Sequence, residues 1–80
     1  MKFKWLEGAD RNHIAEIIRT SYLGERQSLA WTVGMIASSK FSGEDLVAIL
    51  DLLDQDSALD ETKKQKMFKL RTELKNKSLL

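Results

Sequence analysis

Hydrophobic residues recur along most of this chain at spacings of three and four positions, which is the period of an amphipathic α-helix. The pattern predicts helices over about 10–23, 25–39, 42–55 and 57–76. Loops of a few residues separate them, as in a helix bundle. We therefore expect an all-α fold, with residues 1–80 forming one small domain of about four short helices.

Polar residues and glycine mark where these helices begin and end. Asp10 or Asn12 can cap the first helix, and Ser57 or Asp60 can cap the fourth. Gly24 is expected to stop the first helix, because glycine is the commonest residue just after a helix C-terminus.

The third helix has the clearest start, because Ser42 and Asp45 have the spacing of a capping box. Val47 and Leu52 widen the apolar side of this helix, which is typical of a central position in the bundle. The expected core stripes of the four helices are Ile14, Ile17, Ile18 and Tyr22; Leu29, Val33, Ile36 and Ala37; Leu46, Ile49, Leu50 and Leu53; and Met67, Leu70 and Leu74.

Residues 1–9 differ from the rest, because Lys2, Phe3, Lys4 and Trp5 alternate as in a strand. A lone strand has no partner in a helical chain, so we expect an extended N-terminal arm whose Phe3 and Trp5 cover the bundle. Pairing of this arm with a second copy of the chain is the alternative.

The composition is that of a folded protein, with 42% hydrophobic and 31% charged residues. The chain has no cysteine, which excludes disulfides and thiolate chemistry. It has no apolar run of signal-peptide or membrane-span length, so we expect a cytoplasmic protein with no membrane partner. A core this small has limited stability, and a homodimer is one way to supplement it.

The acidic stretch 51–65, "DLLDQDSALDETKKQ", invites comparison with a calcium loop. An EF-hand that starts at Asp54 needs an oxygen ligand at position 5, glycine at position 6 and glutamate at position 12. Those places hold Ala58, Leu59 and Gln65. We interpret the stretch as a turn between two helices.

His13 is the only histidine, and Asp10 and Glu16 lie three residues to either side of it. Such a flank resembles a carboxylate–histidine metal site but lacks a complete ligand set. A solvated histidine in a first helical turn explains the pattern more simply. Without a glycine-rich phosphate loop or a second possible imidazole base, we expect no enzyme activity, no catalytic or metal site and no cofactor.

The seven residues "LAWTVGM" resemble the first helix and turn of a DNA-binding helix-turn-helix. That resemblance would imply a second helix with buried apolar residues where this chain has Lys40 and Gly43. The next predicted helix also opens with Glu44 and Asp45, whose charges repel phosphate.

Charge is distributed very unevenly, although the net charge is only +1. Residues 41–61 contain seven acidic and no basic side chains, whereas residues 62–80 contain seven basic and one acidic. On the last helix, Lys64, Arg71 and Lys75 line one flank beside Phe68, which makes this flank a candidate protein-binding surface. The alternative is that the basic side chains pair with the acidic third helix while Phe68 extends the core.

Trp31 and Met35 form a second candidate contact, because they point away from the predicted core stripe of the second helix. The alternative is that this helix is sandwiched, with Phe3 and Trp5 covering Trp31.

The sequence thus favours a small non-enzymatic regulatory or adaptor protein, an inhibitor among the options, that binds another protein. The partner surface would be acidic, and one of the contacts would serve a homodimer. Nucleic-acid binding through the basic last helix is the alternative function.

Overall fold

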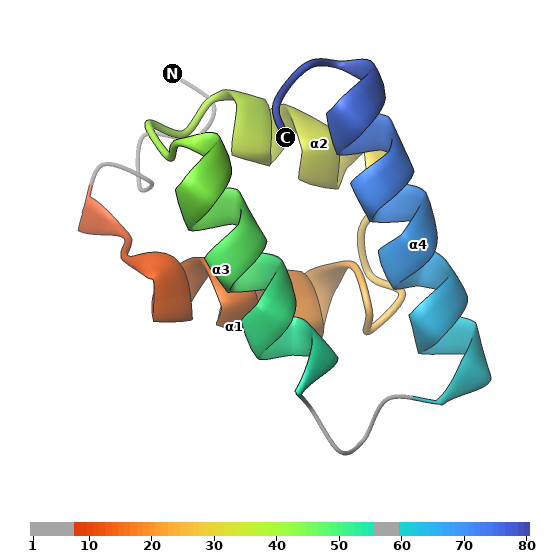
Figure 1. Cartoon of the computed structure of the whole chain (residues 1–80). Helices are drawn as coiled ribbons and strands as arrows, with labels where there is room; N and C mark the ends of the chain where they lie inside the picture. The colour runs from red at the N-terminus through yellow and green to blue at the C-terminus, as the bar shows by residue number, and fades with distance from the viewer. Residues whose placement is uncertain (1–7, 56–59) are drawn as a thin grey trace.

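The computed structural model describes residues 8–55 and 60–80 and forms a small all-α bundle (Figure 1). In this part of the chain there are four helices and no strand, which confirms the predicted fold class. Residues 1–7, including Phe3 and Trp5, and residues 56–59 lie outside the described part, so the predicted arm is not tested. The helices are α1 (Arg11–Ser21), α2 (Leu29–Ala37), α3 (Gly43–Asp54) and α4 (Glu61–Asn76).

Each of the four helices begins at a side chain that accepts a hydrogen bond from a free backbone N–H. Asp10 caps α1, and Asp60 caps α4 by accepting from the Lys63 N–H at 2.9 Å. At α3 both bonds of the predicted capping box are present, between Ser42 and Asp45. Such caps stabilise a helix by about 1 kcal/mol each. The Ser42 cap was predicted from sequence, Asp10 and Asp60 were each one of two candidates, and the Ser28 cap of α2 was not predicted.

The second helix is shorter than the predicted range 25–39, because residues 22–28 form a loop and α2 begins only at Leu29. Glu25 takes a left-handed backbone conformation with φ of 62°, which a helix cannot contain. Ser28 then caps α2 by accepting from the Trp31 N–H at 3.1 Å.

Gly24 lies within this loop, after the end of α1 at Ser21. Its φ is not positive, so it is not a left-handed helix stop. A Cβ at this position would stand 2.3 Å from the Thr20 carbonyl oxygen. Glycine is needed here because the chain passes so close to the last turn of α1.

One hydrophobic core joins the four helices, and α1 packs mainly against α3 while α2 packs against α4. The predicted stripes of α1, α3 and α4 are confirmed, with Ile17 only partly buried. Leu79 and Leu80 fold back onto this core beyond α4. The buried stripe residues are Ile14, Ile18 and Tyr22; Leu46, Ile49, Leu50 and Leu53; and Met67, Leu70 and Leu74.

The predicted core face of α2 is wrong in two places. Met35 has 0% of its surface exposed, although it was expected to face solvent, whereas Ala37 is exposed. Trp31 is half-buried and packs against the core. The helix is therefore covered on more than one side, while the predicted covering of Trp31 by Phe3 and Trp5 lies outside the described residues. A nine-residue helix this apolar can bury nearly any of its faces.

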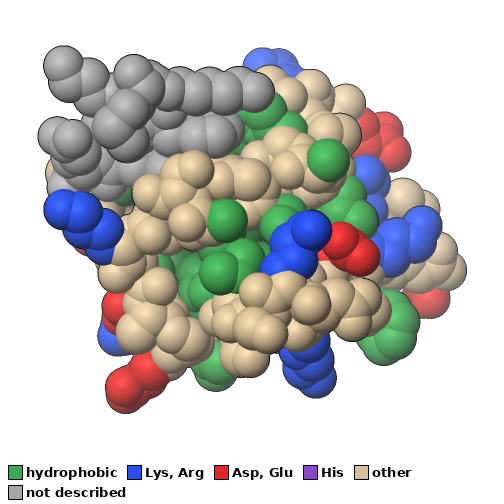
Figure 2. All heavy atoms as spheres, turned by 90° about the horizontal axis from the view of Figure 1, so that it is seen from above, with side chains coloured by type: hydrophobic (Ala, Val, Ile, Leu, Met, Phe, Trp, Pro, Cys, Tyr) green, Lys and Arg blue, Asp and Glu red, His purple; other side chains and the backbone are tan. Residues whose placement is uncertain are grey.

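Gly34 lies inside α2, and five residues separate this helix from α3. The sequence "LAWTVGM" therefore does not contain the turn that a helix-turn-helix requires. A Cβ at Gly34 would meet no atom within 4 Å, so the packing of neighbouring helices does not require glycine at this position. Ala30, Gly34 and Ala37 instead line a shallow groove beside α4. Figure 2 views the molecule from above and shows hydrophobic side chains between stretches of backbone and uncharged side chains.

Candidate protein-binding surface

Phe68 is the most exposed large hydrophobic side chain in the described part of the chain, with 70% of its surface accessible. It lies on an exposed flank of α4, turned away from the buried stripe of that helix. This exposure contradicts the alternative in which Phe68 extends the core. The aromatic ring is therefore a surface feature of the folded chain.

Charged side chains surround Phe68. A shallow hollow on α4 is lined by Glu61, Lys64, Gln65, Phe68 and Lys69, and we call these five residues the Phe68 patch. Lys75 is also exposed, two turns beyond Phe68 on the same flank. The patch offers an apolar centre with a cation on either side.

Arg71 belongs to the predicted contact flank but is engaged within the chain. Its Nη1 donates to Asp54 Oδ1 at 3.2 Å, and its Nη2 also contacts the other carboxylate oxygen of Asp54. Asp51 Oδ1 lies 4.0 Å from the same Nη2. The alternative interpretation expected this pairing of a basic side chain with the acidic third helix. Arg71 therefore joins α4 to α3. The exposed cations that remain on the flank are Lys64 and Lys75.

The second candidate contact does not form a surface of its own. Met35 is fully buried and Trp31 is half-buried against the core. Trp31 retains some accessible surface, but the structure does not bring it together with the Phe68 patch. The two predicted sites therefore do not merge into one.

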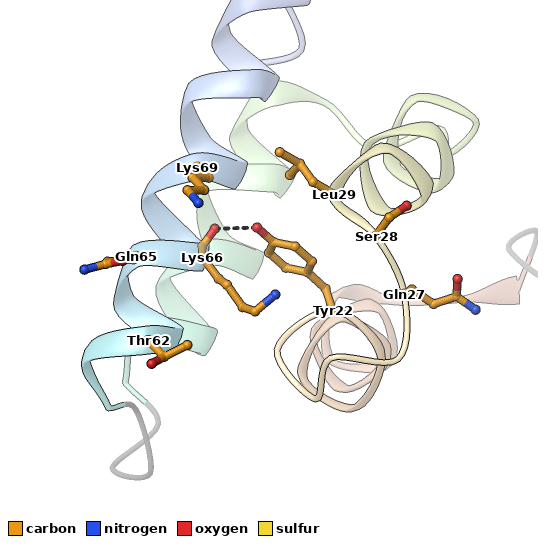
Figure 3. A pocket seen from close by; sticks show the side chains of 8 residues that line it. All are labelled: Tyr22, Gln27, Ser28, Leu29, Thr62, Gln65, Lys66 and Lys69. Carbon is orange, nitrogen blue, oxygen red and sulfur yellow. Dashed lines mark hydrogen bonds between the residues drawn. The ribbon is translucent and has the colours of Figure 1, made fainter.

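A pocket between α4 and the loop before α2 is a feature that sequence reasoning missed (Figure 3). The Tyr22 hydroxyl donates to the Lys66 carbonyl oxygen at 2.8 Å, and Lys66 Nζ lies 4.8 Å from the centre of the Tyr22 ring. Burial raises the pKa of Tyr22 above its usual value. The helical spacing of Tyr22 predicted that it is a core residue. No local feature of the sequence indicated that its hydroxyl would bond to Lys66 on α4.

The ion pairs outside this surface are structural. Arg11 Nε donates to Asp45 Oδ1 at 2.7 Å and so ties α1 to the first turn of α3. The Arg11 guanidinium, followed by the Ser42 backbone N–H, lowers the pKa of Asp45 below its usual value. An exposed pair of this kind adds little to stability.

His13 is exposed in the first turn of α1, where its backbone N–H donates to Asp10 Oδ1 at 2.8 Å. Asp10 is thereby used as a helix cap. Within residues 8–55 and 60–80, no three histidine or carboxylate side chains are arranged to hold a metal ion. In the acidic stretch, Asp54 pairs with Arg71 and Asp60 caps α4, while residues 56–59 lie outside the described part.

None of the four helices is long and apolar enough to cross a membrane, as judged over the described residues. Neither a protein-family model, nor a curated protein, nor a solved structure matches this chain.

Proposed function

We propose that this chain is a small, non-enzymatic regulatory or adaptor protein that acts by binding another protein through the Phe68 patch. The observation that carries the proposal is the exposure of Phe68 at the centre of a charged helix face. Aromatic side chains at such positions are typical of interaction hot spots.

The size of the effect can be worked out from the exposed fraction. A phenylalanine that is 70% exposed presents roughly 140 Å² of mostly apolar surface. Covering it would contribute roughly 3.5 kcal/mol at about 25 cal/mol per Å², which is about three-hundredfold in affinity. One side chain can thus account for a large part of a micromolar interaction.

The lysines favour a partner surface with carboxylates on either side of an apolar side chain. Lys64 and Lys69 flank the ring, and their side chains can reach carboxylates without leaving solvent. Glu61 in the same hollow, and Asp51 and Asp54 beside Arg71, would repel the continuous phosphates of nucleic acid. The geometry therefore supports protein binding over the alternative function.

The experiment uses the full chain as bait against an extract of its native host, with Phe68→Ala and the matched control Thr62→Ala. Thr62 is exposed on another side of α4. We expect a partner that the parent chain and the control retain and that Phe68→Ala loses, with unchanged helicity by circular dichroism. Retention of the partner by Phe68→Ala would refute the proposed surface.

A titration with single-stranded and duplex oligonucleotides at low salt tests the alternative function. Binding that falls steeply with salt, and that is lost in Lys64→Glu combined with Lys75→Glu, would replace the present proposal with a nucleic-acid-binding role.

A further inference from the structure

Two large hydrophobic side chains are exposed among the described residues, and they lie on helices of opposite charge. Phe68 lies on the basic helix α4, and Val47, with 50% of its surface accessible, lies on the acidic helix α3. Glu44 precedes Val47 by three residues and Asp51 follows it by four, so one carboxylate stands a helical turn to either side. Val47 thus has the surroundings that the Phe68 patch would select in a partner.

The ion pairs of Arg71 bring these two helix flanks together. Asp51 and Asp54 share the flank of α3 that carries Val47, at four and seven residues from it. Arg71 is three residues from Phe68 and reaches both carboxylates. Val47 and Phe68 therefore lie on adjoining flanks of α3 and α4, which run in opposite directions in Figure 1.

We propose that this α3–α4 face docks onto the same face of a second copy, with Val47 of each chain against Phe68 of the other. A two-fold axis that passes between Val47 and Phe68 exchanges the two chains, so both Val47–Phe68 contacts form at once and the assembly closes as a dimer. The same operation places acidic α3 of one chain opposite basic α4 of the other. An arrangement with α3 on α3 would oppose like charges and is disfavoured.

The balance of charge on the face selects a second copy over an unrelated partner as its full complement. Glu44 and Asp51 on the α3 half are matched by Lys64 and Lys75 on the α4 half, while Asp54 and Arg71 pair within each chain. A purely acidic partner matches the α4 half alone and is repelled by the other half. A face with one acidic and one basic half is best complemented by the same face of a second copy, because the two-fold axis places each acidic half opposite a basic half.

This inference rests on the proposed function only in using Phe68 as the contact residue. A second copy covers the Phe68 patch with its own Val47, so an acidic partner must compete with the dimer. Self-association is measured on the purified chain alone, whereas partner capture is measured from an extract, so each proposal can fail separately.

The test is sedimentation velocity of the full chain between about 1 and about 500 µM at low and high salt. We expect a dimer that weakens at high salt, and that weakens at least about tenfold in Phe68→Ala and in Val47→Ala. Both substitutions replace exposed side chains with a strong helix former, so folding is retained.

A charge-exchange pair makes the test specific. One variant carries Lys64→Glu and Lys75→Glu, and the other carries Glu44→Lys and Asp51→Lys. Each alone should be monomeric, because it opposes like charges, whereas their mixture should form a heterodimer at least as strong as the parent dimer. The matched control is Arg26→Glu with Lys40→Glu, which changes the net charge equally at exposed positions outside the face.

Several outcomes would overturn the inference. A chain that stays monomeric throughout the concentration range excludes self-docking. A dimer unaffected by Phe68→Ala and Val47→Ala uses another surface. A mixture of the two charge variants that stays monomeric, with both folded by circular dichroism, excludes the α3-to-α4 pairing. If either charge variant unfolds, the two alanine variants alone decide.

Discussion

The substitutions Phe68→Ala and Leu70→Ala test whether the structure separates surface from core correctly within one helix. The two residues are two positions apart on α4 and so point to different sides of it. Phe68 is 70% exposed, whereas Leu70 is fully buried. Sequence left open whether Phe68 extends the core. The two variants should therefore differ sharply in stability.

For Phe68 the cost follows from the small fraction of its surface that is buried. About a third of a side chain of ~200 Å² is covered, or roughly 60 Å², which is worth about 1.5 kcal/mol at most. Alanine recovers about 0.5 kcal/mol through its higher helix propensity. We expect a net loss of about 1 kcal/mol or less in the free energy of unfolding.

For Leu70 the cost includes a cavity, because the side chain is enclosed by the other helices. Substitutions of this kind cost about 2–5 kcal/mol. A chain of this size has a total stability of only about 4–12 kcal/mol, so Leu70→Ala comes close to unfolding the domain.

Urea unfolding followed by circular dichroism measures both values, with equal slopes serving as a check on two-state behaviour. If Phe68→Ala costs more than about 2 kcal/mol at a protein concentration where the parent is monomeric, the side chain is part of the core. The proposed binding surface would then be wrong.

Two further predictions concern the loop between α1 and α2, and the second compares a glycine of this loop with one inside α2. Tyr22→Phe removes the hydroxyl that donates to Lys66, so we expect a loss of about 1 kcal/mol near neutral pH. Burial raises the pKa of Tyr22, so the parent chain loses free energy of unfolding as the pH rises from about 10 through the folded-state pKa. Tyr22→Phe lacks this group and should lose less stability over the same pH range. Urea titrations that show an equal loss for both proteins would contradict this prediction. Gly24→Ala forces a Cβ against the Thr20 carbonyl and should cost about 1–3 kcal/mol, whereas Gly34→Ala meets nothing within 4 Å and should gain up to about 1 kcal/mol; melting temperatures that move together would refute the contrast.

The sequence alone determined the helical architecture and most of its core. The capping box of Ser42 and Asp45 and the stripe of Met67, Leu70 and Leu74 are local signals, because a helix fixes which residues share a side. Those signals do not depend on where the other helices lie. For this reason the predictions for α1, α3 and α4 agree with the structure.

Hydrophobic periodicity gave a wrong prediction for α2, because its local sequence is compatible with more than one buried face and more than one starting residue. Most residues of α2 are apolar, so the covered sides depend on the neighbouring helices, and Met35 is buried as a result. The predicted second helix began at Glu25, because none of the residues 25–28 is incompatible with a helix. In the structure Glu25 has a left-handed backbone conformation, so α2 begins only at Leu29.

Tertiary structure alone decided which parts of the surface remain available for binding. The spacing of residues on α4 placed Phe68, Lys64, Arg71 and Lys75 on one flank, but it could not show that Arg71 is held by Asp54 while Phe68 stays exposed. It also could not show that Val47 lies on the adjoining flank of α3. Periodicity assigns a side chain to a face of its own helix, whereas exposure and pairing depend on which other helix meets that face.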